Sequence, residues 1–130
     1  MNLTIETTRL DGLVVLDLGG DLDVYCYSLG LKETAVSLLC DGERDFLLDL
    51  EKVDYIDSVG LSALVGILRR ASEHGGSVSL VCTNLQFLKM FDTTGLSRIF
   101  TIYPSRERGI RRMTATLCVP KKPAIAGAGR

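Results

Sequence analysis

The sequence predicts a single α/β domain whose mixed β-sheet opens with a β-hairpin and is flanked by about four helices. Three observations support this fold class. A turn dipeptide separates two apolar runs near the N-terminus, strand-like and helix-like periodicities alternate after it, and 46% of the 130 residues are apolar, enough for one hydrophobic core. We expect this domain to cover residues 1–112 and a flexible basic tail to follow at residues 113–130.

The first two strands are predicted at residues 3–8 and 13–18. The first run alternates apolar and polar residues, the second is rich in Val and Leu, and Asp11-Gly12 lies between them. Because Asp-Gly favours a tight hairpin turn, we expect the two strands to pair in antiparallel orientation. Gly19-Gly20 then ends the second strand.

A helix and a buried strand are predicted next. Apolar residues recur at helical spacing over residues 28–40, and Asp41-Gly42 ends the pattern. Residues 45–50 form a short apolar run that is typical of a strand buried on both faces. A loop is expected at residues 54–60.

The clearest helical pattern follows this loop and ends at Gly75-Gly76. Its expected buried face consists of Leu61, Leu64, Val65 and Leu68. A strand rich in β-branched residues is expected at residues 77–82.

The last part of the domain is predicted as helix, strand and helix. Asn84 can cap the first of these helices and Gly95 can end it, with inward positions at Leu85, Leu88 and Phe91. A strand at residues 99–103 and a short helix through Arg112 follow. The expected order is β-β-α-β-α-β-α-β-α.

Charge is distributed unevenly along the chain. Five of the 15 basic residues and none of the 16 acidic residues lie in residues 111–130, which leaves 10 basic and 16 acidic residues in the rest. Nucleic-acid affinity depends largely on neutralising phosphates with basic side chains. We therefore expect no nucleic-acid binding by this acidic body.

The sequence offers no pattern for a metal, cofactor or catalytic site. Its four cysteines form no CxxC pair, and one His completes no zinc set. Cys40 and Cys82 lie in apolar stretches and are expected to be reduced core residues, which suits the cytoplasm. No signal-peptide pattern is visible, and no run approaches the roughly 18 apolar residues of a membrane span, so no membrane insertion is expected.

The most informative segment is Asp57-Ser58-Val59-Gly60-Leu61, between a predicted strand and a predicted helix. Either Asp57 or Ser58 can cap the helix, and on spacing alone the segment indicates no more than a cap. Ser58 would then be exposed at the helix N-terminus, where anions are favoured. Gly60 leaves room for another backbone to approach the first turn.

The sequence resembles the anti-sigma factor antagonists, small bacterial proteins of the STAS-domain family. The family's Asp-Ser-x-Gly-Leu motif matches residues 57–61 without interruption. Its Gly-x-Leu-Asp segment resembles residues 20–23, and its Thr-Gly-Leu segment matches residues 94–96. The resemblance covers residues 3–112 and implies a STAS-like fold.

The resemblance also implies a function controlled by phosphorylation of Ser58. Its implied partner is an anti-sigma factor with serine-kinase activity, which the unphosphorylated protein sequesters so that a sigma factor is freed for transcription. Phosphorylation would release the partner, and a serine phosphatase of the PP2C type would reverse it. The residues implied at this surface are Asp21, Asp23, Asp57, Ser58, Val59 and Gly60.

Two alternatives remain open at this point. A STAS domain can also serve as an accessory subunit of a membrane lipid transporter. A phosphorelay receiver would instead accept phosphate on Asp49 and use Asp21, Asp23 and Thr83 nearby. The opening hairpin, and Tyr103-Pro104 where a receiver has a Lys, count against the receiver.

Overall fold

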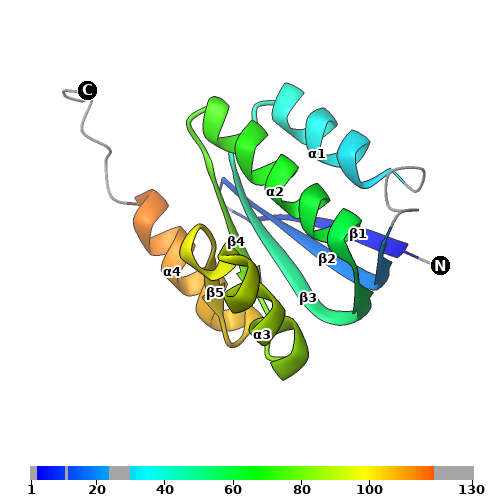
Figure 1. Cartoon of the computed structure of the whole chain (residues 1–130). Helices are drawn as coiled ribbons and strands as arrows, with labels where there is room; N and C mark the ends of the chain where they lie inside the picture. The colour runs from blue at the N-terminus through cyan, green and yellow to red at the C-terminus, as the bar shows by residue number, and fades with distance from the viewer. Residues whose placement is uncertain (1–2, 11, 24–29, 119–130) are drawn as a thin grey trace.

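The computed structural model describes residues 3–10, 12–23 and 30–118, which form one five-stranded β-sheet with helices on both faces (Figure 1). The strands lie in the order in which the chain makes them, β1-β2-β3-β4-β5. The elements are β1 Leu3–Leu10, β2 Leu13–Leu22, α1 Leu31–Cys40, β3 Asp45–Ile56, α2 Ser58–Glu73, β4 Ser77–Val81, α3 Leu85–Thr94, the 3-10 turn η2 Leu96–Arg98, β5 Thr101–Tyr103 and α4 Arg106–Cys118. This confirms the predicted fold class and element order.

The sheet is mixed because only its first pair of strands is antiparallel. β1 and β2 form the predicted hairpin, with Leu10 opposite Leu13 and Gly12 in the left-handed conformation that such a turn requires. β2, β3, β4 and β5 then run parallel, each joined to the next by a helical crossover.

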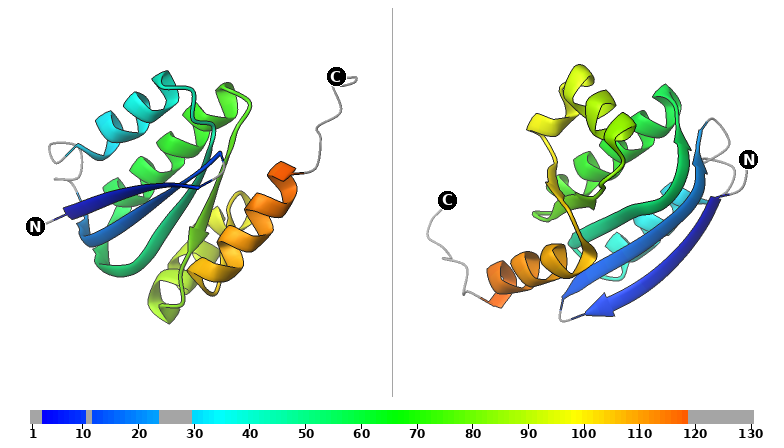
Figure 2. Two further views of the ribbon diagram at one scale, coloured as in Figure 1. Left: turned by 180° about the vertical axis from the view of Figure 1, so that it is seen from behind. Right: turned by 90° about the horizontal axis from the view of Figure 1, so that it is seen from below.

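The helices divide unequally between the two faces. Side chains of α1, α2 and α3 share one large apolar cluster with one face of the sheet, whereas α4 alone contributes Met113 to a smaller cluster on the other (Figure 2). Residues 45–50 of β3 are therefore buried on both faces, as predicted. In this way α4 lies on the opposite side of the sheet from α2.

An ion-paired arginine fastens α4 to the sheet. Arg106 donates from Nη2 to Asp17 Oδ2 and from Nε to Asp49 Oδ2, both at 2.8 Å. The two aspartates are register partners on β2 and β3. The hydrogen bonds to Asp17 and Asp49 raise the pKa of the Arg106 guanidinium above its ordinary value.

Several expectations about element ends need correction. β2 does not end at Gly19-Gly20 but continues through Leu22, since it stays paired with β3 across two register shifts. The loop expected at residues 54–60 is strand as far as Ile56 and helix from Ser58.

β3 does not end at residue 50 but continues through Ile56, because β2 bends alongside it and supplies a partner as far as Leu22. The last strand begins at Thr101 rather than residue 99, since η2 occupies the preceding residues. α4 extends past Arg112 because Met113 reaches the second apolar cluster. Residues 119–130 of the expected tail lie outside the described part of the chain.

Some predicted core positions are also different. Leu85 is 80% exposed, because Phe87 and Phe91, one turn apart, form the inward face of α3. Cys40 is exposed at the end of α1, whereas Cys82 is buried as expected. The buried face of α2 is rotated from the prediction; its buried residues are Gly60, Ala63, Leu64, Ile67 and Ala71.

No helix in the described part of the chain is long and apolar enough to cross a membrane.

Candidate functional site

The first turn of α2 lies where β2 and β3 end side by side. Asp21 is the register partner of Tyr55, and Leu22 is the partner of Ile56. The next residue, Asp57, donates its backbone N–H to the carbonyl of Leu22 at 3.1 Å as the chain leaves the sheet. The parallel pairing therefore brings the segment around Asp21 next to the start of α2.

Asp57, not Ser58, caps α2. Its backbone is extended, and its Oδ1 accepts a hydrogen bond from the N–H of Gly60 at 2.9 Å. Its carbonyl accepts the first helical bond from the N–H of Leu61 at 2.9 Å. Ser58 is consequently the first helical residue, and its exposed side chain is not needed for the cap.

Gly60 holds the end of β2 against the first turn of α2. A Cβ atom at this position would lie 2.0 Å from the carbonyl oxygen of Leu22, which no real side chain could tolerate. The backbone that approaches Gly60 is thus the chain's own. Gly60 is buried, so its contribution here is to set the distance between two segments of the site.

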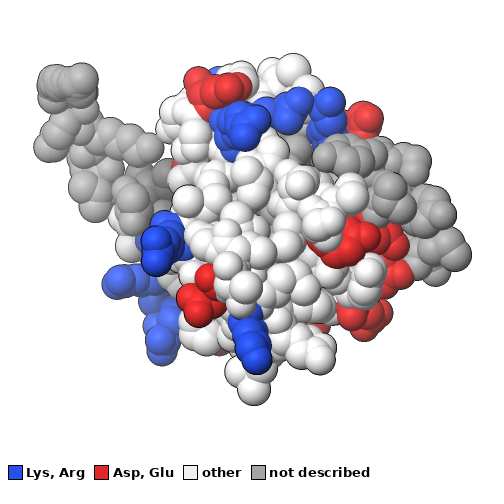
Figure 3. Space-filling model, in the orientation of Figure 1, with Lys and Arg blue, Asp and Glu red and all other residues white. Residues whose placement is uncertain are grey.

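Three aspartates belong to the segments that meet at the exposed Ser58. Asp57 and Asp21 are half-buried, and Asp23 is only 9% exposed. Figure 3 shows acidic surface gathered beside the start of α2. The positive end of the α2 dipole favours an anion at Ser58, whereas the neighbouring side chains make the same surface negative.

A groove runs from Ser58 along α2 to the turn between α3 and η2. It encloses about 440 Å³ and is lined by Ser58, Leu61, Ser62, Val65, Gly66, Arg69, Thr94 and Leu96. Its floor is partly apolar, because Leu61, Val65 and Leu96 are half-buried. Sequence reasoning placed Ser58 correctly at a helix start but did not identify the far wall. The Thr94-Gly95-Leu96 segment was the available signal for that wall.

The residues of the receiver alternative do not come together. Asp49 faces α4, where it binds Arg106 and accepts from the N–H of Glu51 at 3.0 Å. The N–H and hydroxyl of Thr83 both donate to the Glu51 carboxylate at 2.8 Å. Asp21 lies beyond this region, at the far end of β2. Within the described ranges, no group of three or more His, Cys, Asp or Glu is placed to hold a metal ion.

The remaining reactive side chains show ordinary structural surroundings. Burial raises the pKa of the Cys82 thiol, which disfavours the thiolate that a nucleophile needs. His74 is exposed at the end of α2, with its Nδ1 2.8 Å from the carbonyl oxygen of Arg70.

Comparison with known proteins agrees with this architecture. The family model described as the STAS domain matches residues 4–109. A crystal structure of an anti-sigma factor antagonist from Mycobacterium paratuberculosis superimposes with a TM-score of 0.76 at 21% identity, over 87% of this chain and 95% of that chain. This similarity shows a shared fold.

Two curated relatives are similar in sequence over nearly their whole length. The anti-sigma-B factor antagonist of Staphylococcus aureus (strain NCTC 8325 / PS 47) is 34% identical over 107 residues, which are 82% of this chain and 98% of that protein. The anti-sigma-B factor antagonist of Bacillus subtilis (strain 168) is 31% identical over 111 residues, 85% of this chain and 100% of that protein. With the family match covering most of the domain, the chain belongs to the STAS domain family, alongside relatives that are anti-sigma factor antagonists.

Proposed function

We propose that this protein is an anti-sigma factor antagonist, a binding protein rather than an enzyme, that is controlled by phosphorylation of Ser58. Unphosphorylated, it binds an anti-sigma factor with serine-kinase activity and so frees a sigma factor; phosphorylated, it releases that partner. The observation that carries the proposal is the division of roles at the start of α2. Asp57 supplies the cap, which leaves the Ser58 hydroxyl exposed and free of a structural task.

The electrostatics of the site support a switch that depends on charge. A phosphate adds about −1.5 to −2 charges at neutral pH. An interface matched to a neutral hydroxyl on this acidic surface would then contain a strong additional negative charge. Like-charge contacts across an interface cost several kcal/mol, which corresponds to a loss of affinity of at least about a hundredfold.

The phosphorylated protein itself remains stable under this proposal. A phosphate on Ser58 lies at the N-terminus of the 16-residue helix α2, where the helix dipole and unpaired N–H groups favour an anion. The Ser58 side chain is exposed and contributes nothing to the apolar clusters. Its exposure also gives a kinase, and the proposed PP2C-type phosphatase, access to the hydroxyl.

The surface in contact with the partner is proposed to include Asp21, Asp57, Ser58 and Val59, with Asp23 beneath it, since Asp23 is only 9% exposed. The end of β2 and the start of α2 present these residues together, since Gly60 allows the two backbones to touch. Gly60 acts as a positioning residue, because it is buried beneath this surface.

The direct test is phosphorylation by the anti-sigma factor kinases of the source organism. The wild-type protein, Ser58→Ala and Ser62→Ala would each be incubated with ATP and each purified kinase, and their intact masses measured. Ser62 is a matched control because it is exposed one turn further along α2 and lines the same groove. We expect one phosphate (about 80 Da) on the wild type and on Ser62→Ala, and none on Ser58→Ala.

Phosphate that persists on Ser58→Ala would contradict the assignment of the site. The absence of both phosphorylation and binding with every anti-sigma factor kinase would overturn the proposed function. The accessory-subunit function in a membrane transporter would then be the remaining use of this fold.

A further inference from the structure

Gly66 lies in the middle of α2, where no close contact within the described part of the protein requires a glycine. A Cβ at Gly60 would collide with Leu22, but a Cβ at Gly66 would meet only Arg70 Nη1, at an ordinary contact distance of 3.6 Å. Its backbone is helical and needs no positive φ. Glycine destabilises a helix interior relative to alanine. A helix that keeps glycine at an outward position without an internal contact is suited to close approach by another molecule.

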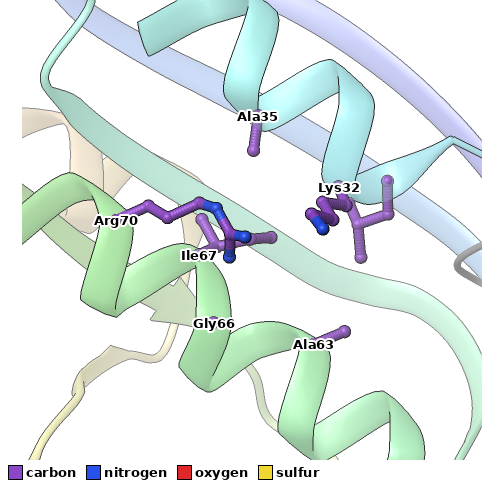
Figure 4. Close-up of a pocket in the computed structure, with 7 residues that line it drawn as sticks. Lys32, Ala35, Ala63, Gly66, Ile67 and Arg70 are labelled. Carbon is purple, nitrogen blue, oxygen red and sulfur yellow. The ribbon is translucent and has the colours of Figure 1, made fainter.

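Two depressions on either side of α2 meet at Gly66. One is the groove that begins at Ser58 and reaches the turn between α3 and η2. The other is a small notch of about 30 Å³ between α1 and α2 (Figure 4). The notch is lined by Leu31, Lys32, Ala35, Ala63, Gly66, Ile67 and Arg70. Gly66 belongs to both linings, so the two depressions border the same residue of α2.

Three basic side chains border this low point. Lys32 and Arg70 reach over the notch from α1 and α2 (Figure 4), and Arg69 lines the groove on the other side of α2. Among the described residues, none of the three forms an ion pair. Their acidic sequence neighbours, Glu33 and Glu73, line neither depression. We call Lys32, Gly66, Arg69 and Arg70 the Gly66 surface.

We propose that the Gly66 surface receives an acidic amphipathic helix of the anti-sigma factor, in addition to the contact at Ser58. This inference rests on the proposed function, because it concerns the same partner. One partner could contact both places, because a single groove is lined by Ser58, Gly66 and Arg69.

The chemistry of the surface specifies this occupant. Glycine at a crossing point lets two helix backbones approach closely. The notch, with Ala35, Ala63 and Ile67 on its walls, accepts part of one aliphatic side chain. Lys32 and Arg69 on opposite sides of α2 would pair with acidic residues that flank that side chain. The region around Ser58 then reports phosphorylation, and the Gly66 surface determines which anti-sigma factor is recognised.

The test measures the affinity of each purified anti-sigma factor of the source organism for the full chain. The variants are Gly66→Leu, Gly66→Ala, the double variant Lys32→Glu/Arg69→Glu, and Ser58→Asp. Matched controls are Ala115→Leu and Arg111→Glu, which make similar changes at exposed positions of α4 on the opposite side of the sheet. Thermal unfolding confirms that each variant is folded.

We expect Gly66→Leu and the double charge reversal each to weaken binding by at least about tenfold, because one fills the crossing point and the other repels acidic residues. Gly66→Ala should bind more weakly than wild type even though its Tm is higher. The salt dependence of binding should also change sign in the double variant, because added salt then screens repulsion instead of attraction. Both α4 controls should bind like wild type.

Separate outcomes distinguish this inference from the proposed function. If Ser58→Asp abolishes binding while Gly66→Leu and the charge reversal bind like wild type, the Gly66 surface is not a contact and the proposed function stands. If both Gly66 surface variants lose affinity while Ser58→Asp binds normally, the surface is a contact and the phosphorylation switch is wrong. Failure of the wild type to bind any anti-sigma factor overturns both.

Discussion

The glycines at positions 60 and 66 occupy one helix but differ in what surrounds them. Gly60 is pressed against the carbonyl of Leu22, whereas a methyl group at Gly66 would make only an ordinary contact with the Arg70 side chain. The sequence indicates a close backbone approach at Gly60 and gives no signal at Gly66. The structure shows that a side chain would collide with backbone at Gly60 but not at Gly66.

We therefore expect alanine at the two positions to have opposite effects on stability. Gly60→Ala should lower the free energy of unfolding by about 1–3 kcal/mol, because the contact is with backbone that cannot rotate away. Gly66→Ala should raise it by up to about 1 kcal/mol through helix propensity. Urea denaturation measures both, and a change of 1 kcal/mol corresponds to a Tm shift of about 4 °C. Changes of the same sign would contradict the contacts described here.

Most elements could be predicted because they are determined by residues close together in the sequence. The ends that were predicted wrongly depend on contacts between distant parts of the chain. The turn at Gly12, the Asn84 cap and the Gly95 stop all depend on residues close together in the sequence, so each could be predicted. The extension of β3 to Ile56 depends on β2 lying beside it, and that pairing joins distant parts of the chain.

The candidate site likewise combines features that the local sequence determines with features that depend on distant contacts. The segment from Asp57 to Leu61 identifies itself in the sequence, and its cap is local. The groove wall formed by Thr94 and Leu96 exists only because α3 packs beside α2 on the same face of the sheet. Likewise, no periodicity could reveal that Arg106 pairs with Asp17 and Asp49.

The attachment of α4 through Arg106 gives a prediction at the scale of the element. Arg106→Leu would leave the largely buried Asp49 without the arginine that pairs with it, and would leave Asp17 with only the longer contact of 3.6 Å to the exposed Lys52 Nζ. The Arg106 side chain is 40% exposed. We therefore expect the substitution to lower the free energy of unfolding by about 2 kcal/mol, which is less than for a fully buried ion pair. Urea denaturation would measure it, with Arg108→Leu at an exposed position of α4 as the control.

The difference in free energy of unfolding between wild type and Arg106→Leu should depend on pH in a defined direction. The pKa of Arg106 is raised, so in wild type the guanidinium stays charged and its stabilisation is lost only at strongly alkaline pH. Acid weakens ion pairs in general because it removes carboxylate charge, and Arg106→Leu has no ion pair at this position to lose. The difference in stability between variant and wild type should therefore be smaller at pH 4 than at pH 7. A stability difference of equal size at pH 4 and pH 7 would mean that Arg106 stabilises the protein through packing rather than through its charge.

The molecule as a whole combines a rigid sheet with a modification site at one of its ends. Ser58 follows directly on the capped junction of β3 and α2, which hydrogen bonds and the close Gly60 contact tie to β2. Nothing in that junction needs to move to admit a phosphate.

We accordingly expect phosphorylation to leave the fold unchanged. In amide NMR spectra of the two forms, shifts should change for residues 57–62 and for the end of β2, because the new charge is close to them. Amides of β4, β5 and α4 should keep their positions. Widespread shifts that include α4 would instead indicate a rearrangement of the sheet and would contradict a switch based on charge alone.

The position of α4 on the far side of the sheet has a consequence for any second binding protein. A molecule that docks on α4 is separated from Ser58 by the thickness of the sheet and of the helical layer that α2 belongs to. It would hold the modified and unmodified forms with equal affinity. That face is therefore available as a permanent attachment point, through which the protein can be kept at one place in the cell while its opposite face exchanges partners.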